Sequence, residues 1–121
     1  MAKILLVEDD ELLLKAYTRK LEMAQYEVET AVDGIDGLEK AKQLKPDLIL
    51  IDILMPRLNG IEVLKRIKAD PELKAIPVIA LTNVTSSETT EECLRAGCVS
   101  YIIKSSTIPS GVLKEIKKVL D

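Results

Sequence analysis

The stretch LILIDILMP, residues 48–56, contains an apolar run that ends abruptly in one carboxylate, Asp52, with Pro56 four residues later. A run this short and this apolar is typical of a strand that is buried on both faces, as in a parallel sheet. In open parallel sheets, ligands bind at the edge formed by the carboxyl ends of the strands. Asp52 stands where such a strand opens to solvent, so it is the first candidate for a reactive residue.

Four other short runs share this strand-like character. The central strand is expected at residues 47–51. The other four strands are expected at residues 3–7, 26–31, 77–81 and 99–103. The run at 26–31 alternates apolar and polar residues, which predicts a strand with one wetter face.

Helical signals fill the gaps between these runs. Apolar residues recur at helical spacing over residues 11–24 and 35–44. Residues 59–62 have the form of a capping box and predict a third helix. A fourth helix is expected between a second capping-box pattern at 85–88 and a glycine cap signal, and a fifth from Pro109 onward.

Strict alternation of strands and helices predicts an α/β fold, a doubly wound five-stranded parallel sheet with helices on both faces. Right-handed crossovers leave few topologies, and the flavodoxin-like order 2-1-3-4-5 is the common one at this size. The chain has 121 residues, without an internal repeat or a linker. Residues 1–121 are therefore expected to form a single domain.

The composition argues against several classes of function. The net charge of −3 and the absence of Phe and Trp disfavour direct binding of nucleic acid. No apolar stretch is long enough to span a membrane and no signal peptide is evident, so a cytoplasmic location is expected. The chain has no histidine, which removes histidine-based catalysis and metal binding. Cys93 and Cys98 match no redox or zinc pattern and are expected to be buried thiols.

Polar residues follow four of the predicted strands. Glu8 and Asp9 follow the first, Asp52 the third, Thr82 the fourth and Lys104 the fifth. Alone, an acidic run at a helix start is usually a cap, and an Asp before a turn is usually turn chemistry. Because the carboxyl ends of parallel strands meet at one edge, the joint pattern instead predicts one cleft.

Three carboxylates in one cleft repel one another, so a divalent cation is expected there. Mg²⁺ prefers oxygen ligands and commonly takes one or two carboxylates together with a phosphoryl oxygen. Lys104 adds a positive charge on the other side. The site therefore suits a phosphoryl group carried by Asp52, whose carboxylate is the nucleophile.

With these residues in place, the chain resembles a response-regulator receiver domain of two-component signalling, of the stand-alone, chemotaxis-regulator-like kind. The resemblance covers essentially all of the chain. It rests on five motifs in order, namely Glu8-Asp9, residues 52–56, Asn59-Gly60, Leu81-Thr82 and residues 101–104.

The resemblance implies that Asp52 accepts a phosphoryl group from a phosphohistidine on a sensor histidine kinase or a histidine phosphotransfer protein. It implies that Asp9 and Asp52 ligate Mg²⁺ together with the main-chain carbonyl of Leu54, while Glu8 acts mainly through water. Lys104 would pair with Asp52 and then with the phosphoryl group. Such a protein is no conventional enzyme, but it catalyses its own phosphotransfer and a slow hydrolysis of the aspartyl phosphate.

The resemblance also implies a phosphorylation-activated switch. The hydroxyl of Thr82 would move toward the phosphoryl group, and Tyr101 would turn inward. The face formed by the fourth helix, the fifth strand and the fifth helix would then change for an unknown downstream protein. A monomer or a weak phosphorylation-linked dimer is expected, with no membrane partner.

Several positions depart from the usual receiver pattern. Asn83 replaces a small residue after the switch threonine, and Ser105 replaces the proline that usually follows the lysine. Because a cis bond before a residue other than proline costs about 2.5–4 kcal/mol, the Lys104–Ser105 bond is expected to be trans. Leu54 and Val84 cannot orient a water for hydrolysis, which predicts a long-lived phosphoryl group.

Other classes fit the sequence less well. A haloacid-dehalogenase-type phosphatase needs a second Asp at position 54, where this chain has Leu54, and a flavodoxin needs a phosphate loop instead of the acids at 8–10. A pseudo-receiver that acts as a protein-binding scaffold without phosphorylation stays open, although intact Asp9, Asp52 and Lys104 argue against it. A receiver excised from a longer kinase or output protein also stays open, although the start and end of the chain favour a stand-alone receiver.

Overall fold

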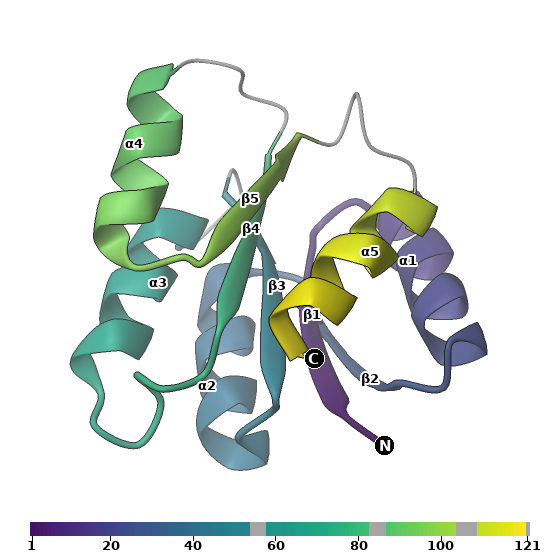
Figure 1. Ribbon diagram of the computed structural model, residues 1–121. Coiled ribbons are helices and arrows are strands. Elements are labelled where there is room, and N and C mark those ends of the chain that lie inside the picture. The colour runs from purple at the N-terminus through teal and green to yellow at the C-terminus, as the bar shows by residue number, and fades with distance from the viewer. Residues whose placement is uncertain (54–57, 83–86, 104–108, 121) are drawn as a thin grey trace.

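The computed structural model describes residues 1–53, 58–82, 87–103 and 109–120 (Figure 1). Within them lie five parallel strands in the order β2-β1-β3-β4-β5, which confirms the predicted α/β fold and topology. The strands are β1 (Lys3–Val7), β2 (Glu27–Ala31), β3 (Leu48–Asp52), β4 (Val78–Thr82) and β5 (Ser100–Ile103). The helices are α1 (Glu11–Met23), α2 (Gly34–Leu44), α3 (Gly60–Ala69), α4 (Ser87–Ala96) and α5 (Pro109–Leu120).

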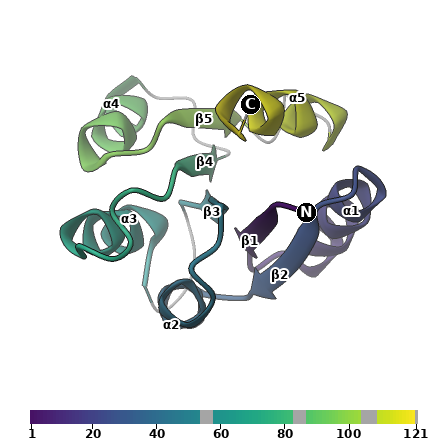
Figure 2. The same ribbon diagram turned by 60° about the horizontal axis from the view of Figure 1, so that its bottom comes forward.

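The helices cover both faces of the sheet, as predicted. Helices α1 and α5 lie on one face, and α2, α3 and α4 lie on the other (Figures 1 and 2). Each crossover from one strand to the next parallel strand passes through one of these helices, which is the usual way to connect parallel strands. All the strands therefore end at the same edge of the sheet.

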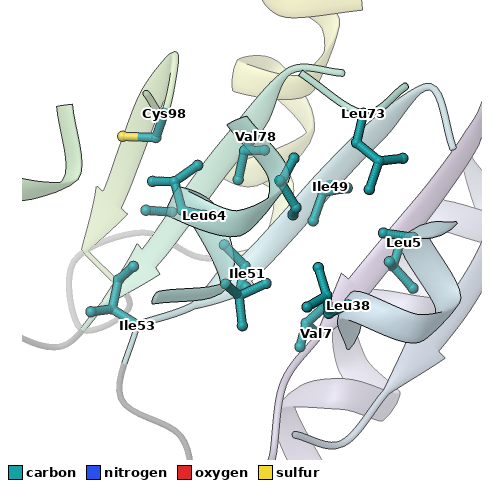
Figure 3. Packing of buried hydrophobic residues seen from close by; sticks show 14 of the residues in the cluster. Leu5, Val7, Leu38, Ile49, Ile51, Ile53, Leu64, Leu73, Val78 and Cys98 are labelled. Atoms are coloured by element: carbon teal, nitrogen blue, oxygen red, sulfur yellow. The ribbon is translucent and has the colours of Figure 1, made fainter. Parts of the chain in front are cut away.

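Two apolar clusters hold the layers together. Along β1, Ile4 and Leu6 face α1 and α5, whereas Leu5 and Val7 face the other three helices. Figure 3 shows the second cluster, in which side chains of the central strands meet Leu38 of α2 and residues of α3. Because the apolar residues of β1 and β3 are buried on both faces, the central runs have no polar alternation, as the sequence indicated.

Side chains at the helix ends explain where the helices begin. Asp10, Asp33 and Asn59 are the N-caps of α1, α2 and α3, and each accepts a hydrogen bond from a backbone N–H in the first turn. Asn59 forms one half of the predicted capping box, because its Oδ1 accepts a hydrogen bond of 3.0 Å from the amide of Glu62. The second capping-box pattern, at residues 85–88, includes residues outside the described ranges.

The end of α4 confirms both the glycine cap and the buried thiols. Gly97 has a φ of +114°, a conformation that favours glycine. The amide of Cys98 donates to the carbonyl of Cys93 at 3.2 Å, which closes the helix end. Both cysteines are free and buried, and burial raises the pKa of Cys98 to about 11.

Several boundaries differ from the prediction by one residue, and two of them have a clear local cause. Strand β3 includes Asp52, because the amide of Ile53 donates to the carbonyl of Leu81 at 3.0 Å and so extends the pairing with β4. Helix α2 starts at Gly34, because Asp33 already caps it. Among the described residues, no helix has both the length and the apolar character that crossing a membrane requires.

Candidate functional site

Three carboxylates meet at the carboxyl edge of the sheet, between β1 and β3. Val7 pairs with Ile51 in the parallel register, so the residues that follow these two positions lie side by side. Carboxylate oxygens of Glu8, Asp9 and Asp52 all lie within 4.8 Å of one another. The structure thus brings together the three acidic residues that the sequence predicted for one cleft.

The backbone fixes Glu8 in a buried position. Its amide donates to the carbonyl of Ala31 at 3.0 Å, which continues the pairing of β1 with β2 past the end of the strand. Its carboxylate accepts a hydrogen bond of 3.0 Å from the amide of Asp10. Glu8 is fully buried, whereas Asp9 is exposed.

The third acid of this run, Asp10, has a structural role. Its Oδ1 accepts hydrogen bonds from the amides of Leu12 and Leu13 at 3.0 and 3.2 Å, so it caps α1. The cap interpretation of the acidic run is therefore confirmed for Asp10 alone, and the two residues before it lie with Asp52 instead. Glu8 and Asp9 form the cluster, and Asp10 starts the helix.

Asp52 lies in β3, the central strand of the sheet, which pairs with β1 and β4. It is 5 % exposed, and it pairs with Leu81 of β4. Behind it, the amide of Gly60 donates to the carbonyl of Ile53 at 2.9 Å. A Cβ atom at Gly60 would lie only 2.3 Å from the carbonyl oxygen of Asp52, so the start of α3 rests directly on the backbone of the site.

The start of α2 packs close to Leu58, just before α3 begins. Asp33 is buried, and its Oδ1 accepts a hydrogen bond of 2.9 Å from the amide of Asp36. A Cβ atom at Gly34 would lie 1.9 Å from the carbonyl oxygen of Leu58, so α2 packs against the residues that precede α3. The sequence marked Asp33 and Gly34 only as a helix start, because nothing local in it shows a contact with residue 58.

The donor set fits a hard divalent cation. Carboxylate oxygens are the ligands that Mg²⁺ prefers, and three of them lie close enough to surround one ion. Carboxylates this close repel one another when they carry charge. A cation at this point relieves that repulsion, and Glu8, Asp9 and Asp52 are the described residues that would hold it.

The other predicted site residues are placed only in part. Thr82 is the last residue of β4, at the same edge as Asp52. Tyr101 lies in β5 and is exposed. Leu54 and Lys104 lie outside the described residues, as do Asn83, Val84 and Ser105, so their predicted roles stay predictions.

Comparisons with known proteins agree with this geometry. Residues 4–116 match the family model of the response regulator receiver domain. The chain is 39 % identical over 106 residues to the polar-differentiation response regulator DivK of Brucella anthropi, a match that covers 88 % of this chain and 86 % of that protein.

Solved structures show the same fold. The chemotaxis response regulator CheY4 of Vibrio cholerae matches with a TM-score of 0.93 at 35 % identity, over 99 % of both chains. The receiver domain of a sensor histidine kinase from Pseudomonas aeruginosa PAO1 matches with a TM-score of 0.90 at 28 % identity, over 98 % of this chain and 97 % of that one. That structure is described with a magnesium ion coordinated in its active-site cleft. This chain belongs to the response-regulator receiver domains of two-component signalling.

Proposed function

We propose that Asp52 is the phosphoacceptor of this receiver domain. The observation that carries the proposal is the cluster of Glu8, Asp9 and Asp52 at the carboxyl edge of the sheet, with oxygens within 4.8 Å of one another. The donor is a phosphohistidine on a sensor histidine kinase or a histidine phosphotransfer protein. A carboxylate oxygen of Asp52 attacks phosphorus, the phosphorus–nitrogen bond breaks, and the imidazole leaves with its electron pair.

The chain's own residues have separate tasks in this step. Asp9, Asp52 and the main-chain carbonyl of Leu54 would hold Mg²⁺, and Glu8 would act through water. When bound, Mg²⁺ supplies positive charge against the phosphoryl oxygens. Lys104 supplies a second positive charge. Asp52 is buried, which should limit the access of water to the acyl phosphate.

Phosphorylation then shifts the protein between two states. Thr82 donates its hydroxyl to the phosphoryl group, and Tyr101 turns inward. The exposed position of Tyr101 on β5 supports this role, because an exposed side chain can become buried when it turns inward. The α4–β5–α5 face changes, and a downstream protein binds there. A ligand shifts such an equilibrium only through contacts that differ between the states, and the phosphoryl contacts exist in one of them.

The wider assignments follow from this role. We place the protein in the cytoplasm, where residues 1–121 act as one receiver unit without direct contact with nucleic acid or a membrane. The protein is a monomer or a weak phosphorylation-linked dimer. Its catalysis is limited to its own phosphotransfer and the slow loss of the phosphoryl group.

Asp52→Asn tests the proposal directly. The amide is almost the same size as the carboxylate but is not a nucleophile, so the variant should accept no phosphoryl group. Wild-type protein incubated with phosphoramidate and Mg²⁺ should gain the mass of one phosphoryl group, and Asp52→Asn should gain none. Asp47→Asn, at the opposite edge of the sheet, should behave as wild type. No mass gain in the wild type would support the scaffold alternative instead.

A second expectation concerns the lifetime of the phosphoryl group. Leu54 and Val84 offer no polar group to orient a water for hydrolysis. The aspartyl phosphate should therefore persist for many minutes. Leu54→Glu supplies a carboxylate two residues beyond Asp52 and should speed hydrolysis by about tenfold or more. Intact mass against time measures both rates. Loss from the wild type within seconds would contradict the expectation.

A further inference from the structure

A groove lies between α3 and α4, which are neighbours on the face of the sheet away from α1 and α5 (Figures 1 and 2). Its volume is about 530 Å³, and small-molecule sites in proteins have roughly 300–1,000 Å³. Two small residues and four charged residues line this α3–α4 groove, namely Ala69, Ala96, Lys65, Lys68, Arg95 and Glu92. Three cations and one carboxylate give the lining a net charge of +2, whereas the whole chain has −3.

Packing fixes the most buried of these cations, Lys68. Its Nζ donates to the main-chain carbonyls of Lys74 and Ile76 at 3.0 and 2.7 Å. Its methylene groups cross the end of α4, where a Cβ atom at Gly97 would lie only 2.8 Å from the Cγ of Lys68. An ammonium has three donor hydrogens, so one remains for a ligand. Partial burial lowers the pKa of Lys68, and a partly desolvated cation attracts an anion more strongly than one in open water.

The two other cations reach the groove from its two walls. Lys65 belongs to α3 and Arg95 to α4, and both are exposed. Within the described part of the chain, neither of them forms an ion pair. Arg66, by contrast, pairs with Glu62 at 3.5 Å. The groove therefore presents positive charge on both walls that no ion pair in this part of the chain neutralises.

The ends of the helices explain only some of this charge. Lys68 and Arg95 lie in the last turns of α3 and α4, where the helix dipole stabilises a cation. Lys65 lies before the last turn of α3, so the dipole gives no reason for a cation there. Its position is better explained by the groove that it lines.

A second groove, between α2 and α3, offers a comparison within the same protein. Its volume is about 460 Å³, and its charged lining residues are Lys42, Arg66 and Asp70. Arg66 is already paired with Glu62, which reduces the charge available to a ligand. The α3–α4 groove is thus the more positive of the two and the better site for an anion.

We propose that the α3–α4 groove binds a small molecule that carries two or more phosphate groups. Phosphate oxygens accept hydrogen bonds from both ammonium and guanidinium groups. One phosphate group lies against Lys65 and Lys68 on α3, and another reaches Arg95 on α4. The two alanines add no bulk beyond Cβ, which leaves room for the rest of the molecule. The site is separate from the acidic cluster, and binding to it does not depend on the proposed role of Asp52.

Isothermal titration calorimetry with pyrophosphate tests the inference on the full chain. Protein and buffer are first freed of Mg²⁺ on a chelating resin, because that ion binds pyrophosphate. The test variant is Lys65→Gln/Arg95→Gln, in which both substituted side chains are exposed, so the fold should persist. The matched control is Lys42→Gln/Arg66→Gln, which removes the same charge from the neighbouring groove. Thermal unfolding checks that each variant is folded.

Wild-type protein should bind one pyrophosphate per chain, about tenfold or more tightly than orthophosphate, which does not span both walls. The test variant should lose about tenfold or more in affinity, whereas the control should stay within about twofold of wild type. Glu92→Gln should bind about twofold or more tightly than wild type, because it removes the one carboxylate of the lining.

The location of the bound ligand is measured separately, by the amide chemical shifts of the labelled protein during the titration. The shifts should change in the second half of α3 and the end of α4. No saturable binding to the wild type would overturn the inference, as would equal losses in the test variant and the control. Orthophosphate that binds as tightly as pyrophosphate would overturn it too, as would shift changes confined to the carboxyl edge of the sheet.

Discussion

Gly60→Ala is expected to lower the free energy of unfolding by about 3 kcal/mol, at the upper end of the usual effect of overpacking. The added Cβ would lie 2.3 Å from the carbonyl oxygen of Asp52 and 2.7 Å from the Cα of Ile53. These are backbone atoms of a central strand and of its hydrogen-bonded continuation, so no rotamer change relieves the contact. Urea unfolding followed by circular dichroism measures the loss. The same variant should be phosphorylated more slowly, because Asp52 moves with its backbone.

Gly37→Ala is the matched comparison, because the same residue change there meets a side chain. The added Cβ would lie 2.9 Å from the methyl carbons of Val7. In a Val7→Ala background this contact disappears, so Gly37→Ala should be less harmful there than in the wild type. No side-chain deletion should rescue Gly60→Ala in the same way. If Gly60→Ala is tolerated as well as Gly37→Ala, then α3 does not rest on the site backbone as described.

Asp9→Asn should separate two effects of the acidic cluster, the repulsion among its carboxylates and the binding of Mg²⁺. The amide removes one of three charges whose oxygens lie within 4.8 Å of one another. Without Mg²⁺ the variant should therefore be more stable than wild type, by about 1 kcal/mol after allowance for solvent at the exposed Asp9. Saturating Mg²⁺ should raise the unfolding midpoint of wild-type protein, because the ion binds only the folded state. It should leave the midpoint of Asp9→Asn nearly unchanged.

The neighbouring Asp10→Asn is the control for this experiment. Asn is as good an N-cap as Asp, so the hydrogen bonds to Leu12 and Leu13 are kept while one nearby charge is removed. This variant should keep the response to Mg²⁺. Thermal unfolding is measured without Mg²⁺ and with Mg²⁺ at about tenfold its dissociation constant, and the shift in midpoint distinguishes the two substitutions. An equal response in Asp9→Asn and wild type would remove Asp9 from the proposed ligand set.

The fold was predictable because local and long-range signals agree. The apolar residues of β1 and β3 are buried on both faces, and their uninterrupted runs predicted that. Capping residues such as Asn59 marked helix starts within a residue. Most of the one-residue errors lie at strand ends, where pairing across the sheet decides the boundary. Asp52 belongs to β3 because Ile53 donates to Leu81, a contact that lies 28 positions away in the sequence.

The acidic cluster was predictable for a different reason. The strand order fixes which strand ends are neighbours, so the positions of Glu8, Asp9 and Asp52 followed from the topology. The support behind the cluster was not predictable in this way. The contacts of Gly34 with Leu58 and of Gly60 with Asp52 depend on how closely two backbones approach, and no periodicity reports such a distance. The sequence likewise left open which acid of residues 8–10 caps α1.

Strand β3 has a further consequence for how signals leave the site. It pairs with β1 and β4 on its two sides, and its apolar residues are divided between both clusters. A strand held in this way loses its amide protection only when the whole domain unfolds. Hydrogen exchange around Asp52 should therefore report global opening, and the proposed phosphoacceptor acts as a fixed point. Motion on shorter timescales is expected at the periphery, for example in β5, which among the described strands pairs only with β4.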